Sequence, residues 1–190
     1  MILCVTGLPG SGKTTVARIL KRKGYRLVEM RDGVVDAMAK KHIAITPDSI
    51  REYSIKIRRK YGKQIVARYA MRTIRKLPKK SKIAIVGIRS VQEMQYIKKN
   101  LHAIRVIGVI APRMMRYKRL ADRGSNRDTR DFKKFEERER QELLGYSGNG
   151  KKLEGVGALV DHADFIISNA DSYPKLVKDV NWLLAKMAMA

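Results

Sequence analysis

Short apolar runs alternate along the chain with longer stretches whose apolar residues recur every three or four positions. Apolar runs of four to eight residues are typical of buried strands, and the three- to four-residue spacing is typical of amphipathic helices. Strands that alternate with helices favour an α/β fold, here with a five-stranded parallel sheet covered by helices on both faces. The predicted strands cover residues 2–6, 26–30, 82–88, 103–111 and 164–169.

The stretches between these runs predict helices with clear boundaries. Val16, Ile19 and Leu20 lie at helical spacing, so they are expected to face the core. Thr46 followed by a proline is a typical helix start, and Gly62 ends the helix that begins there. Helices are predicted over 15–24, 34–42, 47–61, 63–77, around Met94, Ile97 and Leu101, over 172–188, and over the charged stretch 112–145, which a polar turn interrupts.

The chain contains no internal repeat and no second predicted core, so residues 1–190 are expected to form one domain. Trp182 is expected to anchor the closing helix in the core.

Cys4 lies in the first apolar run. Because it is the only cysteine, a disulfide within the chain is excluded. No apolar run approaches the roughly 20 residues of a membrane span. We therefore expect a cytoplasmic protein with no membrane partner. The histidines match no metal-ligand spacing and are expected at the surface: His42, His102 and His162.

The first predicted strand runs directly into a glycine-rich loop and then into a helix. The loop consists of Gly7, four residues, and then Gly12, Lys13 and Thr14. This spacing between a strand and a helix is typical of a phosphate-binding loop, whose backbone N–H groups surround the phosphates of a nucleotide. Lys13 is expected to bridge the β- and γ-phosphates of ATP, and the Thr14 hydroxyl to hold Mg²⁺. The expected nucleotide contacts are Gly7, Pro9, Gly10, Ser11, Gly12, Lys13, Thr14 and Thr15.

Positive charge is the unusual feature of the composition. The chain has 42 lysines and arginines against 18 acidic residues, a formal net charge of +24. Segment 51–82 alone contains thirteen basic residues and one acidic residue. Such a segment is either the solvated face of a helix in a basic protein or a surface for a polyanion such as RNA. Tyrosines interleave with these charges, as in surfaces that stack nucleic-acid bases: Tyr53, Tyr61 and Tyr69.

Four pieces of the chain together resemble the nucleoside monophosphate kinase superfamily. They are GLPGSGKTT at 7–15, the aspartate of MRDGVV at 30–35, GIRS at 87–90, and the segment from RYKRLADRG to ADFIISN at 116–169. Within that superfamily the chain is most similar to an archaeal family of adenylate-kinase-related proteins, and dephospho-coenzyme A kinase is a more distant relative. The resemblance implies an acceptor-binding helical insertion over 34–80 and a lid over 113–146.

The resemblance also implies roles for individual cations. Arg119 and Arg123 are expected near the donor nucleotide, and Arg138 at the transferred phosphoryl group. Arg89 follows a buried strand, so it should face the crevice at the carboxyl edge of the sheet and bind the acceptor phosphate. Asn169 resembles the contact that the family makes on the base side of the nucleotide. The candidate lid arginines are Arg116, Arg119, Arg123, Arg127 and Arg138.

Two positions depart from the family pattern. Val86 stands where the family usually has an acidic residue, a partner of Mg²⁺ in the second coordination shell, and Asp36 stands near a usual arginine. Asp32 is expected to compensate as a Mg²⁺ partner, because the second strand should end beside the phosphate-binding loop. With a hydroxyl acceptor, Asp32 would instead be the general base. It is otherwise a turn residue before a glycine.

These observations favour a kinase that transfers the γ-phosphoryl group of ATP, with Mg²⁺, to a nucleoside monophosphate such as AMP. Two alternatives remain open. One is an RNA- or ribosome-associated ATPase whose basic segment 51–82 contacts RNA, with a steep dependence on salt. The other is a kinase for a hydroxyl acceptor, either dephospho-coenzyme A or a polynucleotide end.

Overall fold

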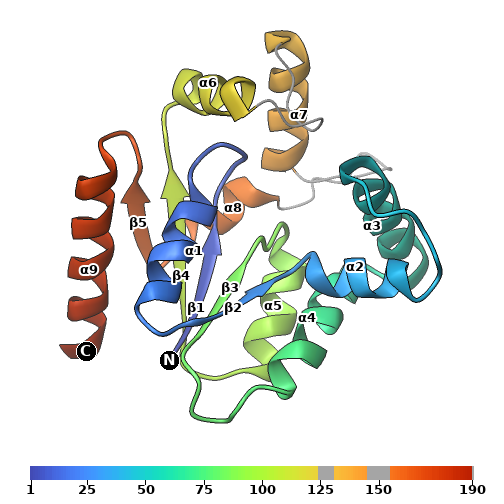
Figure 1. The fold of residues 1–190 in the computed structure, drawn as a ribbon, viewed down its shortest axis with the longest axis horizontal. Helices are drawn as coiled ribbons and strands as arrows, with labels where there is room; N and C mark the ends of the chain where they lie inside the picture. Colours follow the sequence, from blue (N-terminus) through green and yellow to red (C-terminus); the bar gives the residue numbers. More distant parts are fainter. Residues whose placement is uncertain (124–130, 145–154, 190) are drawn as a thin grey trace.

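A computed structural model describes residues 1–123, 131–144 and 155–189. Its sheet has five strands, all parallel, in the order β2-β3-β1-β4-β5 (Figure 1). This confirms the predicted fold class and each predicted strand, to within one to two residues at the strand ends. The strands are β1 (Ile2–Thr6), β2 (Arg26–Glu29), β3 (Ile83–Val86), β4 (Ile104–Ile110) and β5 (Phe165–Ser168).

The helices follow the predicted pattern, with one addition. Helix α8 was not predicted, because its six residues are too few to show helical periodicity. The charged stretch after β4 forms α6 and α7. The helices are α1 (Lys13–Arg22), α2 (Asp32–Ala39), α3 (Pro47–Tyr61), α4 (Ile65–Arg75), α5 (Val91–Asn100), α6 (Arg113–Arg123), α7 (Phe132–Leu144), α8 (Val156–Asp161) and α9 (Tyr173–Met189).

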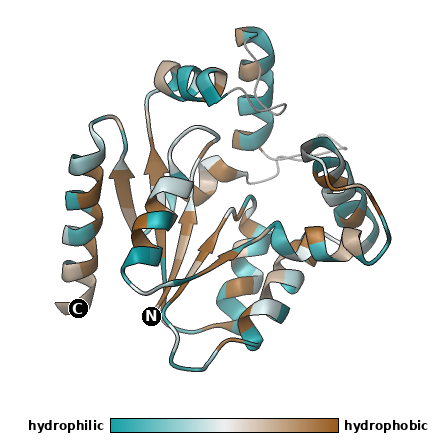
Figure 2. Ribbon diagram, in the orientation of Figure 1, coloured by the Kyte–Doolittle hydropathy of each residue, from teal (hydrophilic) through white to brown (hydrophobic). Residues whose placement is uncertain are grey.

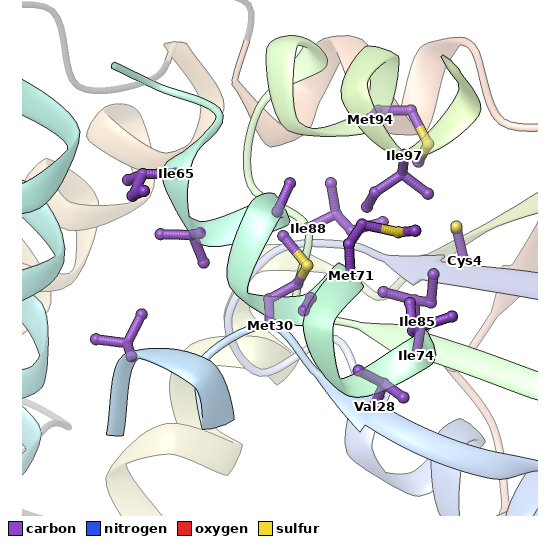
Figure 3. Packing of buried hydrophobic residues seen from close by; sticks show 14 of the residues in the cluster. Cys4, Val28, Met30, Ile65, Met71, Ile74, Ile85, Ile88, Met94 and Ile97 are labelled. Carbon is purple, nitrogen blue, oxygen red and sulfur yellow. The ribbon is translucent and has the colours of Figure 1, made fainter. Parts of the chain in front are cut away.

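Each face of the sheet has its own apolar core. Successive strand residues point to opposite faces, so Leu3 and Val5 pack against α1 and α9, while Cys4 packs against α4 and α5. The core around Cys4 also includes Met71 and Ile97 (Figure 3). Because both faces are covered, the inner strands β1 and β3 are apolar along almost their whole length (Figure 2). Burial raises the pKa of the Cys4 thiol to about 12.

The structure corrects the expectation for Trp182, whose residue surface is 61% exposed. The buried side of α9 follows the spacing i, i+4, i+7 and i+11, and Trp182 falls outside this stripe. Its ring lies beside the ammonium group of Lys186, at 5.1 Å from the ring centroid. The closing helix is instead anchored by aliphatic residues and a methionine: Leu176, Val180, Leu183 and Met187.

Helix α3 confirms its predicted boundaries, whereas α2 begins two residues before its predicted start and ends three residues before its predicted end. The Thr46 side chain accepts a hydrogen bond from the Ser49 backbone N–H at 3.1 Å and caps α3. Gly62, at φ 85°, ends the same helix. Helices α2 and α4 pack closely where Gly33 faces Tyr69.

The three histidines are exposed, as expected. Among the described helices, none is long and apolar enough to cross a membrane.

We predict that Gly33→Ala destabilises the fold by about 1–3 kcal/mol, the usual cost of overpacking. A Cβ at this position would lie 2.5 Å from the Tyr69 Cβ and 3.2 Å from its backbone carbon, so α2 and α4 would have to separate. Urea unfolding measures the change. Asp36→Ala, at an exposed position of the same helix, is the control. Equal stability of the two variants would contradict the close packing.

Candidate active site

The loop between β1 and α1 lies at the carboxyl edge of the sheet, below α6 (Figure 1). Gly12 caps α1 in a left-handed conformation, at φ 98°. Gly10 has φ 77°, and a Cβ at this position would lie 2.6 Å from the backbone oxygen of Arg116 in α6. Glycine adopts such conformations without steric cost. The glycines therefore allow both the tight turn of the loop and the direct packing of α6 against it.

Asn169, just after β5, holds this loop in place. Its Nδ2 donates a hydrogen bond to the backbone oxygen of Ser11 at 2.9 Å, and its side chain fills the space that a Cβ on Gly12 would need. The backbone oxygen of Asn169 accepts a hydrogen bond from Nη2 of Arg119 at 2.9 Å. Asn169 thus joins β5, α6 and the phosphate-binding loop. Its contact with a nucleotide base stays a prediction.

Lys13 begins α1, and its Nζ donates a hydrogen bond to the loop backbone, to the oxygen of Leu8, at 2.8 Å. Its pKa is lowered to about 8, mainly because burial disfavours the charged amine and because Arg89 is nearby. Arg116 and Arg123 lower this pKa further. The structure therefore brings the side chain of Lys13 together with cations from the loop after β3 and from α6.

Arg89 follows β3, the strand next to β1, and lies close enough to Lys13 to lower its pKa. Its backbone N–H donates a hydrogen bond to Oε2 of Glu93 at 2.9 Å. Glu93 is fully buried, and its Oε1 pairs with Nη2 of Arg58 in α3 at 2.7 Å. The guanidinium of Arg89 pairs with Oε1 of Glu142 in α7 at 2.6 Å. Glu93 thus holds the backbone of Arg89 in place, and the carboxylate of Glu142 binds its side chain.

Arg116 is buried and supports the structure instead of lying in solvent. Its Nε donates a hydrogen bond to the backbone oxygen of Ala111 at 2.9 Å, and its Nη2 pairs with Oε1 of Glu139 in α7. Arg113 reaches the other oxygen of Glu139 at 2.6 Å. One carboxylate therefore joins two arginines and fixes α7 against α6.

The remaining predicted arginines occupy different places. Arg119 is half-buried beside the loop, and Arg123 is exposed but close enough to influence Lys13. Arg138 is half-buried on α7, one turn before Glu142. Arg127 lies outside the described residues. Helices α6 and α7, which contain most of the segment 113–146, lie over the carboxyl edge of the sheet (Figure 1).

Asp32 begins α2, and the sheet order corrects its expected position. Strand β3 lies between β2 and β1, so β2 does not end beside the phosphate-binding loop. Two strand spacings separate them, about 10 Å. Partial desolvation, and after it the charge of Glu29, raise the pKa of the Asp32 carboxyl. A raised pKa brings a carboxylate closer to the range of a general base.

A magnesium site made wholly of protein ligands is missing from the described residues, which contain no cluster of three or more histidine, cysteine or acidic residues. Thr14 is exposed in the first turn of α1, beside the loop. Mg²⁺ usually takes one or two protein ligands together with substrate phosphates and water. The Thr14 hydroxyl at this place fits that kind of site, and Val86 supplies no carboxylate to it.

Several site residues were missed at the sequence level, all of them carboxylates and their partners. Glu93 lies three residues after Ser90, whose side chain accepts a hydrogen bond from the Glu93 backbone N–H at 3.2 Å. This spacing signals a capped helix start. On α7, Phe135, Glu139 and Glu142 form one buried stripe. The only signal in the sequence was the helical spacing of Glu139 and Glu142 after Phe135. It could have indicated that two carboxylates occupy positions on the buried side of α7 that are usually apolar.

Comparison with known proteins identifies the family. Residues 3–145 match the family described as an AAA domain. A UPF0200 protein from Pyrococcus abyssi is 32% identical over 190 residues, which cover 98% of this chain and 97% of that protein. The chain belongs to the UPF0200 family. The family matches support the P-loop, kinase-like character of the domain.

Several solved structures similar to this UPF0200 chain are kinases. Shikimate kinase from Acinetobacter baumannii, in complex with shikimate, has a TM-score of 0.62 at 15% identity, over 100% of this chain and 95% of that chain. A gluconokinase from Sinorhizobium meliloti has a TM-score of 0.54 at 13% identity, over 98% and 93% of the two chains. At these identities the similarity establishes the P-loop kinase-like fold.

The low pKa of Lys13 predicts how stability depends on pH. Between about pH 8 and the ordinary lysine pKa near 10.4, the unfolded chain binds a proton at this residue and the folded chain does not. The free energy of unfolding should therefore rise with pH across this window. Urea unfolding of the wild type and of Lys13→Met from pH 7 to 10 measures the difference. A difference between the two proteins that stays constant with pH would contradict the lowered pKa.

Proposed function

We propose that this UPF0200 protein transfers the γ-phosphoryl group of ATP to a nucleoside monophosphate such as AMP. The observation that carries the proposal is the cluster of Lys13, Arg89 and Arg123 around the phosphate-binding loop, close enough for the two arginines to lower the pKa of Lys13. Phosphoryl transfer is catalysed mainly by positioning and by positive charge directed at the transferred group. A cluster of cations beside a phosphate-binding loop provides both.

Unpaired polar atoms near the loop support a polyphosphate ligand. Six buried side-chain atoms lack a hydrogen-bond partner within the described part of the chain, and three of them belong to residues of the loop or of α6 beside it: Oγ of Ser11, Nη1 of Arg116 and Nη1 of Arg119. Burying a polar atom without a partner costs free energy, so such atoms favour a ligand that restores their hydrogen bonds. Phosphate oxygens accept hydrogen bonds from hydroxyl and guanidinium groups alike.

Arg89 is the proposed anchor for the acceptor. Its guanidinium binds the carboxylate of Glu142, so it is oriented toward an anion at the crevice. A phosphate of the acceptor would replace that carboxylate, and two adjacent N–H groups of Arg89 would fix its orientation. Glu93 would position Arg89 through the backbone hydrogen bond and would not touch the substrates. The insertion 34–80 would complete the acceptor site.

A phosphate acceptor would need no general base. An oxygen of the acceptor phosphate is already ionised at neutral pH, so it can form a bond to the γ-phosphorus without losing a proton. The bond from the γ-phosphorus to the β,γ-bridging oxygen breaks, and ADP leaves with that electron pair. Lys13 and Arg123 would stabilise the negative charge on the departing oxygens. Mg²⁺, when bound at Thr14 and the phosphates, would neutralise charge on the β- and γ-oxygens.

Asp32 supports a second candidate, a kinase for a hydroxyl acceptor. A hydroxyl must lose its proton during attack, and the raised pKa of Asp32 suits a base. The position of Asp32 at the carboxyl edge, two strands from β1, would place such an acceptor over β3. Dephospho-coenzyme A and a polynucleotide 5′ end are acceptors of this type. Asp32 would have no catalytic function with a phosphate acceptor.

The direct test offers γ-labelled ATP and Mg²⁺ with AMP, CMP, UMP, GMP, dephospho-coenzyme A or 5′-hydroxyl RNA. Label on one nucleoside monophosphate is the expected result. Label on dephospho-coenzyme A or RNA would replace the proposal with the hydroxyl kinase. Label released only as free phosphate and stimulated by RNA would replace it with an RNA-associated ATPase.

Lys13→Ala should reduce phosphoryl transfer at least about a hundredfold, because the charge at the β- and γ-phosphates is lost. Lys21→Ala removes an exposed lysine from the last turn of the same helix and should leave transfer unchanged. Steady-state rates and thermal unfolding of both variants measure activity and folding separately. Transfer by folded Lys13→Ala at the wild-type rate would rule out the proposed role of the loop.

Arg89→Ala and Asp32→Asn separate the two kinds of acceptor. With a phosphate acceptor, Arg89→Ala should raise KM for the acceptor about tenfold or more, and Asp32→Asn should leave kcat within a few-fold of wild type. With a hydroxyl acceptor, Asp32→Asn should lower kcat by about 10²–10⁴ and remove the acidic limb of the pH profile. Steady-state kinetics across pH 5–9 distinguish these results.

A further inference from the structure

A second concentration of positive charge lies on the outer side of α4. It consists of Arg68, Arg72 and Arg75 of α4 and Lys76, Lys79 and Lys80 of the segment that follows, and is called here the α4 basic face. All six residues are exposed. Spacings of three and four residues place the three arginines on one side of the helix. The opposite side of α4 is buried in the core through Val66, Ala70 and Ile74.

This surface has almost no compensating negative charge. Residues 53–92 contain no aspartate or glutamate. Among the described residues, none of the six cations forms an ion pair. The cations of the active site differ in this respect, since Arg89 and Arg116 are both paired with carboxylates of α7. Unpaired cations of one sign repel one another, and a polyanion relieves this repulsion.

Two of the arginines lie against aromatic rings. The guanidinium carbon of Arg68 lies 5.7 Å from the ring centroid of Tyr96 in α5, and that of Arg72 lies 5.3 Å from the ring centroid of Tyr69. The rings hold the two guanidinium groups in place and reduce the entropy that binding would cost. Guanidinium planes and aromatic rings are the groups on which proteins stack unpaired RNA bases.

The α4 basic face lacks the apolar residues that a membrane surface would require. A helix that lies on a membrane buries exposed apolar side chains among the lipids. The large apolar residues exposed in the described chain lie elsewhere, among them Met114 in α6 and Trp182 in α9, and none is in α4. Charge without exposed apolar surface fits a nucleic acid better than a lipid bilayer.

The α4 basic face belongs to the insertion 34–80, but its lysines lie at the end of the sheet opposite the phosphate-binding loop. Residues 76–82 lead into the amino end of β3, which is level with the amino end of β1. The phosphate-binding loop follows the carboxyl end of β1, about 15 Å away along the strand. An acceptor bound beside the loop would not reach the lysines of this face. Their positive charge therefore has no use in phosphoryl transfer.

We propose that the α4 basic face binds single-stranded RNA through its phosphates and unpaired bases. Lysines and arginines contact the backbone, and Arg68 with Tyr96 and Arg72 with Tyr69 provide places where bases stack. RNA offers unpaired bases in its loops and ends, whereas cellular DNA keeps its bases in the duplex. The proposal stands independently of phosphoryl transfer.

The test measures binding of a fluorescent single-stranded RNA by anisotropy between 50 and 300 mM salt. Log K should fall linearly with log salt, with a slope of about −0.7 for each phosphate contacted. The triple variant Arg68→Glu, Arg72→Glu and Arg75→Glu should weaken binding about tenfold or more at low salt. The slope should also become less steep by about two. ATP binding by the same variant should stay at the wild-type level, which also shows that it is folded.

A matched control reverses three exposed lysines on the opposite side of the sheet: Lys21→Glu, Lys178→Glu and Lys186→Glu. Both triple variants have the same net charge, so general attraction would weaken RNA binding equally in both, and that result would overturn the proposal. Equally tight binding of duplex DNA of the same length would also overturn it. If the charge-reversed α4 variant does not fold, glutamine at the same three positions repeats the test.

Discussion

The concentration of positive charge at the carboxyl edge of the sheet is the constraint on which the rest of the site depends. The amino terminus of α1, Lys13 and Arg89 all lie there, and the cost of burying these charges together lowers the pKa of Lys13, first through desolvation and then through the charge of Arg89. Carboxylates of α7 offset part of that cost: Glu142 pairs with Arg89, and Glu139 pairs with Arg116. Helix α7 is thus held by ion pairs in addition to the apolar packing of Phe135.

The same edge is held together by contacts that leave little freedom to the phosphate-binding loop. Helix α6 packs against Gly10, and the amide of Asn169 lies against Gly12 and donates a hydrogen bond to Ser11. Segments far apart in the sequence therefore preform the loop before any ligand binds. Little free energy is then lost to ordering the loop when a ligand binds. Phosphoryl transfer depends on groups that are held in position in this way.

Much of the large net charge of this UPF0200 protein lies on two surfaces, for which we propose different partners. At the carboxyl edge, arginines are paired with carboxylates and belong to the proposed kinase site. On the α4 basic face, the cations have no such partner among the described residues, and two of them, Arg68 and Arg72, lie beside Tyr96 and Tyr69. A small acceptor bound at the loop would not contact the lysines of the α4 basic face. The proposed RNA surface gives these positive charges a function. A kinase site and a nucleic-acid surface can coexist because the length of a strand, about 15 Å, separates the phosphate-binding loop from the lysines of the α4 basic face.

The sequence by itself determined the five parallel strands, most helices and the phosphate-binding loop, because apolar periodicity and the spacing of Gly7, Gly12 and Lys13 are local properties. It also suggested Arg89, since a residue after a buried strand reaches the crevice. Only the tertiary structure decided which strands are neighbours, and so placed Asp32 two strands from the loop. It alone showed that Trp182 is exposed and that α7 turns its carboxylates inward. These features depend on contacts between distant segments, whose pairing local patterns do not encode.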